Sequence, residues 1–483
     1  MKSRAFGWPQ KQAEWLLPSA LAVLALTLPA YRYRLLWHTG PEDIYFELRD
    51  GFAYLSDFPA LIAIFAWLLT PCPRRIGQLP RWLVAGVTGL ALLATASVLW
   101  APMPSLALYQ AARLWLLLAV FLVVATTSES RGLLAWGLVI SGAIQAGIGL
   151  AQFSLQRTLG LRKLGEIVMR PEWSGASVIT VDGVPTLRAY GLTQHPNLLG
   201  GILMVATLIG AGLVMGMGSG VGARASLSDA VAVGKPRPSE ARRRLTPIIA
   251  IFLTALCFIG LLLTFSRAAW LGTAAGGLAM LLLLLRRTAS KRVAWPAAAA
   301  LVAVLAVIGA AFLVTQWPLL RPRLGLSVEG VEIRSVDERA GLERSALTLI
   351  REHPLVGVGY GNFSIALWQR KSPALEAYPI YQPVHQVPLL AVAELGVPGG
   401  LFWLILALGP WIAIWRRRRT WPTAGMPAGM AASVAGALAA LTVVSWFDFY
   451  PWFSQQGRLL LWICWGLWAQ SVMSNGKGET SNR

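Results

Sequence analysis

Residues 293–315 read VAWPAAAALVAVLAVIGAAFLVT and contain no charged side chain. A helix that crosses the hydrocarbon core of a bilayer needs about 20 consecutive apolar residues. The basic link RRTASKR precedes this run at residues 286–292, and a long polar stretch follows it at residues 315–388. The run therefore predicts a membrane-spanning helix between two polar segments of different character.

Similar runs fill most of the 483-residue chain, which is 56% hydrophobic and only 13% charged. An average soluble domain is about 25% charged. We therefore expect an all-α polytopic membrane protein of about 12 transmembrane helices, forming a single integral membrane domain over residues 1–474. The runs lie near residues 14–31, 52–71, 82–100, 105–126, 132–153, 196–218, 247–264, 268–285, 293–315, 388–415, 424–446 and 458–474.

The basic residues are distributed unevenly between the two sides of these runs. With the N-terminus in the cytoplasm, the inner segments carry 23 Lys and Arg residues against five acidic residues. The outer and embedded segments carry the other 19 basic and 17 acidic residues. This pattern obeys the positive-inside rule, so both termini are expected in the cytoplasm. Residues 219–245 then form a flexible basic cytoplasmic loop, and residues 475–483 a cytoplasmic tail.

The net charge of +20 would suggest a nucleic-acid partner if the protein were soluble. Here the cations lie in short links between apolar runs, where they hold the cytoplasmic face and contact anionic lipid. We therefore expect membrane lipids as partners and no nucleic acid.

Two of the expected outer loops are long, at residues 154–195 and 316–387. The second loop separates the ninth and tenth runs, and we expect it to be partly helical and to carry the chemistry, because functional loops tend to be long. The stretch 315–388 holds eight basic and seven acidic residues. Within it, Leu342, Ala346, Leu349 and Ile350 form one apolar stripe, which predicts an amphipathic helix.

Arg267 lies in LTFSRAAWLG, between two apolar runs at the expected outer surface. Its guanidinium either snorkels to the lipid headgroups or provides a fixed cation for a lipid phosphate. Arginine suits the second role because it binds phosphate oxygens with two parallel hydrogen bonds and stays charged.

The segment LRAYGLTQHPNLLGG closes the first outer loop. The sequence His195-Pro196-Asn197 indicates the start of a helix, with proline in its first turn. Arg188 lies just upstream. Arg188, His195 and Asn197 either form a structural turn with a capping residue or bind the substrate. The sequence leaves both interpretations open.

The expected helix in the second loop carries Arg339 and Arg344, which either face lipid phosphates or form a solvated surface. His385 precedes the tenth run. It can be a structural histidine or a general base, since its ordinary pKa of about 6.5 suits proton removal near neutral pH. Glu394 falls inside the apolar run and needs a polar partner or water. The alternating glycines of GVGYG at residues 357–361 favour a turn packed closely on a helix, and a backbone nest for phosphate is the alternative. A potassium filter is disfavoured, because the leading threonine is missing and one chain supplies only one copy.

Sequence signatures of nucleotide or metal chemistry are not found. The chain contains no Walker A, Rossmann, HExxH or GxSxG motif, and its three cysteines are not spaced as metal ligands. We expect no metal and no cofactor, so that energy enters with an activated lipid substrate.

Four segments together resemble the O-antigen ligase and polymerase superfamily of bacterial envelope glycosyltransferases. They are GLTQHPNLLGG, LTFSRAAWLG, ERAGLERSALTLIREHPLVGVGYGNF and VHQVPLLAVAELGVPGG, and WFDFYPWFSQQGRLLLW resembles the family's C-terminal end. The resemblance spans roughly residues 186–474. It implies a metal-independent transferase in the bacterial plasma membrane, with its active site on the outer face.

By this resemblance, the donor is a glycan on a polyprenyl diphosphate and the acceptor is a hydroxyl on a lipid or a saccharide. Arg267 matches the arginine that engages the diphosphate, Arg339 matches the loop arginine, and His385 matches the histidine proposed as the base. The chain departs from the family pattern at Gln386, where asparagine is common, and at Glu343, where an aromatic residue is common.

The resemblance favours an O-antigen ligase-like transfer. It leaves open a polymerase that extends the lipid-linked chain and a protein O-oligosaccharyltransferase. A polysaccharide or lipid transporter is the non-enzymatic alternative. The sequence disfavours it, because no internal repeat is visible and the cations lie outside the bilayer.

Overall fold

The structure is a computed structural model. It describes residues 7–38, 40–70, 73–173, 175–216, 240–286, 295–326, 330–371, 381–419, 421–422 and 426–473. Most of the expected loop 219–245 and the tail 475–483 therefore lie outside the described residues, although α8 already begins at Glu240.

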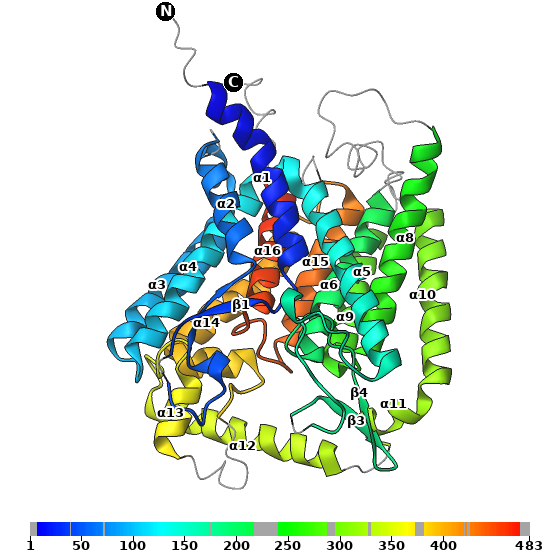
Figure 1. Ribbon diagram of the computed structural model, residues 1–483. Helices are drawn as coiled ribbons and strands as arrows, with labels where there is room; N and C mark the ends of the chain where they lie inside the picture. The colour runs from blue at the N-terminus through cyan, green and yellow to red at the C-terminus, as the bar shows by residue number, and fades with distance from the viewer. Residues whose placement is uncertain are drawn as a thin grey trace, which may run out of the picture.

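Each of the twelve apolar runs contains a helix in the described part of the chain. The long helices pack side by side into one bundle (Figure 1). They are α1 (Gly7–Thr27), α2 (Asp57–Leu68), α3 (Arg81–Ala96), α4 (Pro104–Thr126), α5 (Arg131–Leu155), α6 (Pro196–Gly216), α8 (Glu240–Leu263), α9 (Arg267–Leu285), α10 (Trp295–Thr315), α14 (Val387–Arg416), α15 (Ala428–Val444) and α16 (Gln455–Val472).

Eight spans among the described residues are long and apolar enough to cross a membrane. They correspond to α3, α4, α5, α6, α8, α9, α10 and α14. The apolar parts of α1, α2 and α15 are shorter, and α16 carries Gln455, Gln456, Arg458 and Gln470 among its apolar residues. The expectation of an essentially helical membrane protein is confirmed, whereas the full number of spans stays a prediction.

Small residues bring the central helices together. A Cβ atom at Gly276 of α9 would lie 2.5 Å from the carbonyl oxygen of Gly436 in α15, so only glycine permits this crossing. Membrane helices pack by such close contacts because lipid is as apolar as their side chains. The central helix α6 is the most enclosed span, with 94% of its apolar window buried.

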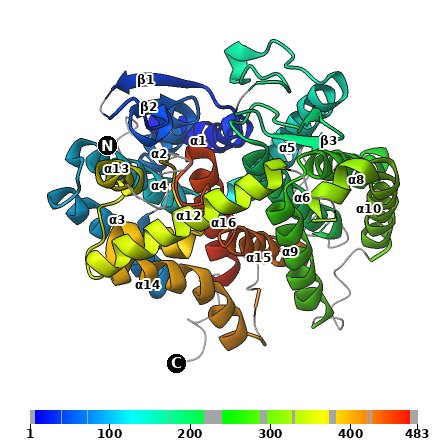
Figure 2. The same ribbon diagram turned by 90° about the horizontal axis from the view of Figure 1, so that it is seen from below.

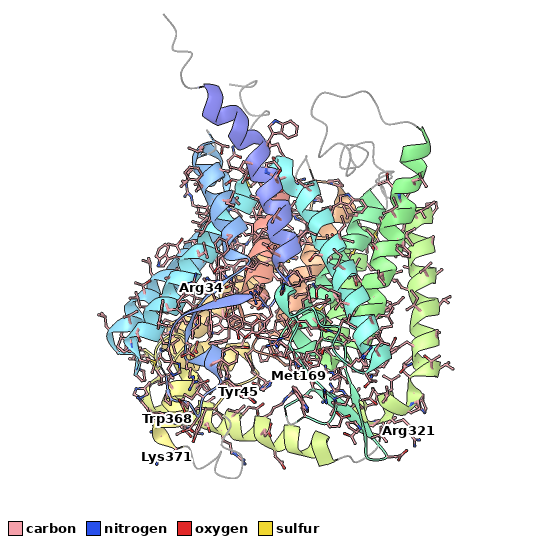
Figure 3. All side chains as sticks on the ribbon, viewed as in Figure 1. Arg34, Tyr45, Met169, Arg321, Trp368 and Lys371 are labelled. Atoms are coloured by element: carbon pink, nitrogen blue, oxygen red, sulfur yellow. The ribbon has the colours of Figure 1, made fainter. Side chains whose placement is uncertain are left out.

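The elements outside the bundle gather at one end of it (Figure 1). Three helices lie between α10 and α14, so the expected partly helical loop is present. They are α11 (Trp317–Arg323), α12 (Gly330–Glu352) and α13 (Phe363–Arg370). Figure 2 shows α12 crossing this end of the bundle, and Figure 1 shows α13 near one end of α12 and α11 toward the other. In Figure 3, Arg321 marks the α11 side, and Trp368 and Lys371 mark the α13 side.

Two antiparallel β-hairpins lie at the same end, and the expectation of an all-α chain did not include them. The first pairs β1 (Tyr33–Trp37) with β2 (Gly51–Tyr54), and the second pairs β3 (Val178–Val181) with β4 (Val184–Leu187). Both turn residues of the second hairpin have positive φ, 51° at Asp182 and 79° at Gly183. Asp-Gly is a strong signal for this kind of turn.

The amphipathic helix expected in the second loop is α12, and its apolar stripe faces the protein. Leu342, Ala346 and Leu349 are at most 2% exposed. At the start of α14, the Gln386 amide donates to Glu343 Oε1 at 2.8 Å and fastens α12 to that end.

The glycine-rich turn after α12 packs on α14, as the sequence indicates. The Val358 and Gly359 N–H groups donate to the carbonyl oxygens of Ala393 and Glu394 at 2.9 and 2.8 Å. The helix is interrupted close by, at Gly396 (φ 65°). A Cβ at Gly357 or Gly396 would meet backbone atoms at 2.3 or 2.2 Å, so both glycines are required sterically.

Candidate active site

The segment from Arg188 to His195 is held against α5 by two glutamines. Gln145 Oε1 accepts from the Leu192 N–H at 2.7 Å, and Gln152 Oε1 accepts from the Gly191 N–H at 2.7 Å. Gly191 has φ 59°, and a Cβ there would lie 2.6 Å from Gln145 Oε1. These bonds fix the course of the chain into α6 and therefore the position of His195.

Arg188 is 4% exposed and joins three separate segments. Its Nε donates to the Thr264 carbonyl at 2.6 Å, its Nη1 to Ser177 Oγ at 2.6 Å, and its Nη2 to Asn197 Oδ1 at 2.7 Å. A buried arginine that forms these bonds cross-links the loop, the start of α6 and the end of α8. This arrangement supports the structural reading of Arg188 over direct substrate binding.

The turn between α8 and α9 presents Arg267 at the first position of α9. Phe265 adopts φ 48°, which is a strained conformation for an aromatic residue. Its buried ring packs on Phe312 with the ring centroids 5.4 Å apart. Ser266 caps α9 by accepting from the Ala269 N–H at 3.4 Å. The Arg267 side chain is exposed, so its guanidinium can reach a ligand.

Arg323, at the end of α11, fastens the same turn from the other side. Its Nη2 donates to the Phe265 carbonyl at 2.8 Å, and its own carbonyl accepts from Arg267 Nη1 at 3.1 Å. The second loop therefore holds the Arg267 turn through Arg323, which the sequence analysis did not identify as a site residue.

His195 caps the start of α6 and still has an accessible ring. Its Nδ1 accepts from the Asn197 N–H at 3.1 Å. The proton of the neutral ring therefore lies on Nε2. Desolvation by the neighbouring protein lowers the pKa of His195 well below its ordinary value. The positive charges of Arg188, Arg323 and Arg339 lower it further.

His385 lies next to this histidine, immediately before α14. Its ring packs edge-on against Phe449, with the centroids 5.2 Å apart. Desolvation and the positive charge of Arg339 lower the pKa of His385 to about 3. Both imidazoles are therefore neutral at neutral pH, and a neutral imidazole can accept a proton.

Asp448, between α15 and α16, provides a carboxylate in the same cluster. Its Oδ2 accepts from Asn197 Nδ2 at 2.8 Å. Burial raises the pKa of Asp448, while Asn197 and the charge of Arg339 partly oppose that shift. Arg339 of α12 therefore acts electrostatically on His195, His385 and Asp448. Through Arg339, α12 supplies a positive charge to the site.

Glu47 extends the cluster toward the N-terminal hairpin. It lies in the short helix η2 (Phe46–Leu48) and accepts a hydrogen bond from the Tyr31 hydroxyl. With the Gln194 amide nitrogen turned toward it, Gln194 donates to Glu47 Oε2 at 2.8 Å. Desolvation raises the pKa of Glu47 to about 7. A second carboxyl group thus lies beside the residue that precedes His195.

The structure brings five of the eight residues proposed from the sequence into this cluster: Arg188, His195, Asn197, Arg339 and His385. It connects Arg267 to the cluster through Arg323. The described contacts do not bring Arg344 there, since its side chain is exposed on α12. Glu394 is buried and accepts from Trp452 Nε1 at 2.9 Å, beside the glycine-rich turn. The hydrogen bond from Trp452 is the polar partner that a carboxyl group inside an apolar run requires.

One comparison with known proteins bears on this cluster. Residues 252–404 match the family model described as O-antigen ligase. The match supports the O-antigen ligase superfamily for this chain and confirms the resemblance drawn from the motifs. It includes Arg267, Arg339 and His385, and it begins after Arg188, His195 and Asn197. A search of curated proteins gives no match.

The family match also bears on activity and location. It supports glycan transfer of the O-antigen ligase and polymerase type, and lipid-linked saccharides as substrates. Together with the eight described helices that are long and apolar enough to cross a membrane, it supports a bacterial inner membrane protein. The matched segment also contains Arg323, the arginine that sequence reasoning missed.

Proposed function

We propose that the protein transfers a glycan from a polyprenyl-diphosphate carrier to an acceptor hydroxyl at the outer face of the membrane. In this proposal all twelve apolar runs span the bilayer and both termini are cytoplasmic. The observation that carries the proposal is the clustering of His195, His385 and Arg339 at the end of the bundle where Arg267 is exposed.

The reaction is a displacement at the anomeric carbon of the donor glycan. The acceptor oxygen forms a bond to this carbon while the bond to the diphosphate oxygen breaks. The polyprenyl diphosphate leaves with the electron pair, so negative charge grows on it in the transition state. Arg267 and Arg339 stabilise that charge, which is the effect that most lowers such barriers.

The acceptor proton passes to His385. A pKa of about 3 makes this ring a weak base in the empty protein. Desolvation is the larger cause of the lowered pKa and Arg339 the smaller one. The negative charge of a bound diphosphate favours the protonated imidazole and opposes the effect of Arg339, so donor binding raises the pKa of His385. Donor binding therefore prepares the base. His195, with its proton on Nε2, donates a hydrogen bond to a substrate oxygen.

The test is a transfer assay with purified protein in vesicles, a lipid-linked glycan, an acceptor, EDTA and no ATP. Transfer under these conditions supports a metal-independent transferase and excludes a transporter. We expect Arg267→Ala, Arg339→Ala or His385→Ala to lower the rate by about 10²–10³, since one charged stabiliser contributes that much. Near-normal transfer in these variants would contradict the assignment.

Two matched variants control for the loss of any arginine or histidine. Arg351 lies on α12, 12 residues after Arg339 and so about 18 Å along the helix axis. His353 follows α12 and is exposed. We expect Arg351→Ala and His353→Ala to transfer normally. The products classify the enzyme: one added block indicates a ligase, a ladder of lengths a polymerase, and glycosylated Ser or Thr a protein O-oligosaccharyltransferase.

A further inference from the structure

A large groove lies at the end of the bundle opposite the histidine cluster. It has a volume of about 580 Å³ and runs between the start of α3 and the last turns of α14. That volume is within the range of about 300–1,000 Å³ that is usual for ligand sites. Because α14 begins beside His385 and ends at Arg416, most of the length of this helix separates the groove from the proposed active site.

Close helix contacts fix the walls of the groove. A Cβ at Gly89 of α3 would lie 2.5 Å from the ring of Phe402, and a Cβ at Gly409 of α14 would lie 2.2 Å from the ring of Trp82. Trp82 also packs edge-on against Trp468 of α16, with the ring centroids 5.7 Å apart. The groove is therefore built into the contact between α3 and α14.

Apolar and cationic residues occupy different parts of the groove. Leu404, Leu408 and Ile412, on successive turns of α14, are 45%, 47% and 48% exposed. Arg81 begins α3 and Arg416 ends α14, so both cations lie at the same end of the groove. None of the described residues that line it is acidic. The groove thus combines a hydrocarbon-like wall with a positively charged end.

We propose that this groove is a binding site for an anionic glycerophospholipid, with an acyl chain along α14 and the phosphate at Arg81 and Arg416. Arginine binds phosphate oxygens with paired, charge-assisted hydrogen bonds. Basic pockets between membrane helices at the cytoplasmic side suit anionic headgroups. A zwitterionic lipid would bring its own cation to this end and lose most of the attraction.

The lipid-linked donor fits the groove less well. Its diphosphate belongs with the reacting carbon, which the proposed function assigns to the other end of α14. The part of α14 after the interruption at Gly396, residues 397–416, alone corresponds to about 30 Å of helix. One diphosphate cannot contact Arg416 and react beside His385 in the same complex.

The experiment is native mass spectrometry of the full-length protein with added phosphatidylglycerol or phosphatidylcholine. We expect the wild type to retain phosphatidylglycerol at least tenfold better than phosphatidylcholine. Arg81→Ala combined with Arg416→Ala should lower the retained phosphatidylglycerol at least tenfold. Ala413→Phe, which fills the groove without changing its charge, should lower retention to a similar extent.

The matched control is Arg418→Ala combined with Arg419→Ala, which removes two cations from the same end of the protein but not from the groove lining. We expect this variant to retain phosphatidylglycerol as the wild type does. Equal losses in the two double variants, or unchanged retention in Ala413→Phe, would overturn the proposal. Displacement of phosphatidylglycerol by a polyprenyl phosphate at equal concentration would overturn it as well.

Discussion

At the scale of single residues, the arginines of the site differ in how their guanidinium groups are used. Arg188 donates to Thr264, Ser177 and Asn197 and is buried. Arg267 is exposed beside it. Both were candidate site residues by sequence, but burial and bonding assign them different roles: Arg188 maintains the structure, and Arg267 is available to a ligand.

This difference predicts opposite effects of truncation. Arg188→Ala leaves three polar partners without their donor, so it should lower the free energy of unfolding by about 3 kcal/mol. Arg267→Ala should change it by less than about 1 kcal/mol, because the side chain is exposed. Thermal unfolding in detergent measures both. An Arg188→Ala protein that is fully stable but inactive would instead indicate a direct role in substrate binding.

The histidine pair predicts a pH dependence of stability. An unfolded histidine has a pKa near 6.5, whereas the folded pKa of His385 is about 3. Between these values the unfolded chain binds more protons, so this contribution to stability is complete above about pH 6.5 and is lost as the pH falls toward 3. His385→Gln should therefore lose less Tm than the wild type between pH 7.5 and pH 5.

Other groups also make stability depend on pH in this range. Because the pKa values of Glu47 and Asp448 are raised, their contributions to stability increase as the pH falls, opposite to that of His385. Both the wild type and His385→Gln contain Glu47 and Asp448, so the difference between their Tm values removes the contribution of these two groups. His353→Gln is the control, because this exposed histidine lies outside the cluster, and its Tm should vary with pH as in the wild type. Parallel curves for His385→Gln and the wild type would refute the lowered pKa of His385.

The sequence identifies the candidate site residues more readily than it identifies their partners. His385, Arg267 and Arg339 carry recognisable local motifs. Asp448 and Arg323 do not, because their contacts depend on how the helices pack. The bond between Asn197 and Asp448 joins residues 251 positions apart. No local pattern encodes such a contact, so it emerges only in the folded bundle.

At the scale of elements, α12 is the part of the second loop that brings Arg339 to the histidines. Its stripe of Leu342, Ala346 and Leu349 was readable from the sequence, because a spacing of three or four residues places side chains on one helical face. The two hairpins were not anticipated, although the Asp182-Gly183 turn is a recognisable signal. Short hairpins are easily missed when apolar periodicity is the main guide.

The buried stripe of α12 packs against the bundle, so we expect transfer activity to depend on the packing of α12 there. Ala346 is completely buried, whereas Leu347 on the same helix is 43% exposed. Ala346→Glu places an unpaired carboxylate between α12 and the bundle. We therefore expect it to detach α12 and to lower the transfer rate at least tenfold. Leu347→Glu should preserve transfer. Hydrogen–deuterium exchange in α12 should increase only in Ala346→Glu, and unchanged exchange there would contradict the docking role.

At the scale of the whole molecule, the two ends of the bundle differ in their chemistry. The loop helices and the hairpins occupy one end (Figures 1 and 2). The histidine cluster lies at the same end, because His195 directly precedes α6 and His385 lies two residues before α14. The arginine-rich end of α14 occupies the other. Charge counting predicts that the second end faces the cytoplasm, and the proposed reaction requires the first end to face outward.

Single cysteines can test this orientation. Cys257 and Cys464 are buried, so Cys72→Ser provides a background with little thiol reactivity. In that background, Arg351→Cys on α12 should react with a membrane-impermeant maleimide in intact spheroplasts. Arg419→Cys should react only after lysis. The reverse pattern would place the histidine cluster in the cytoplasm, where an acceptor displayed on the outer surface could not reach it, and the proposed function would fail with the orientation.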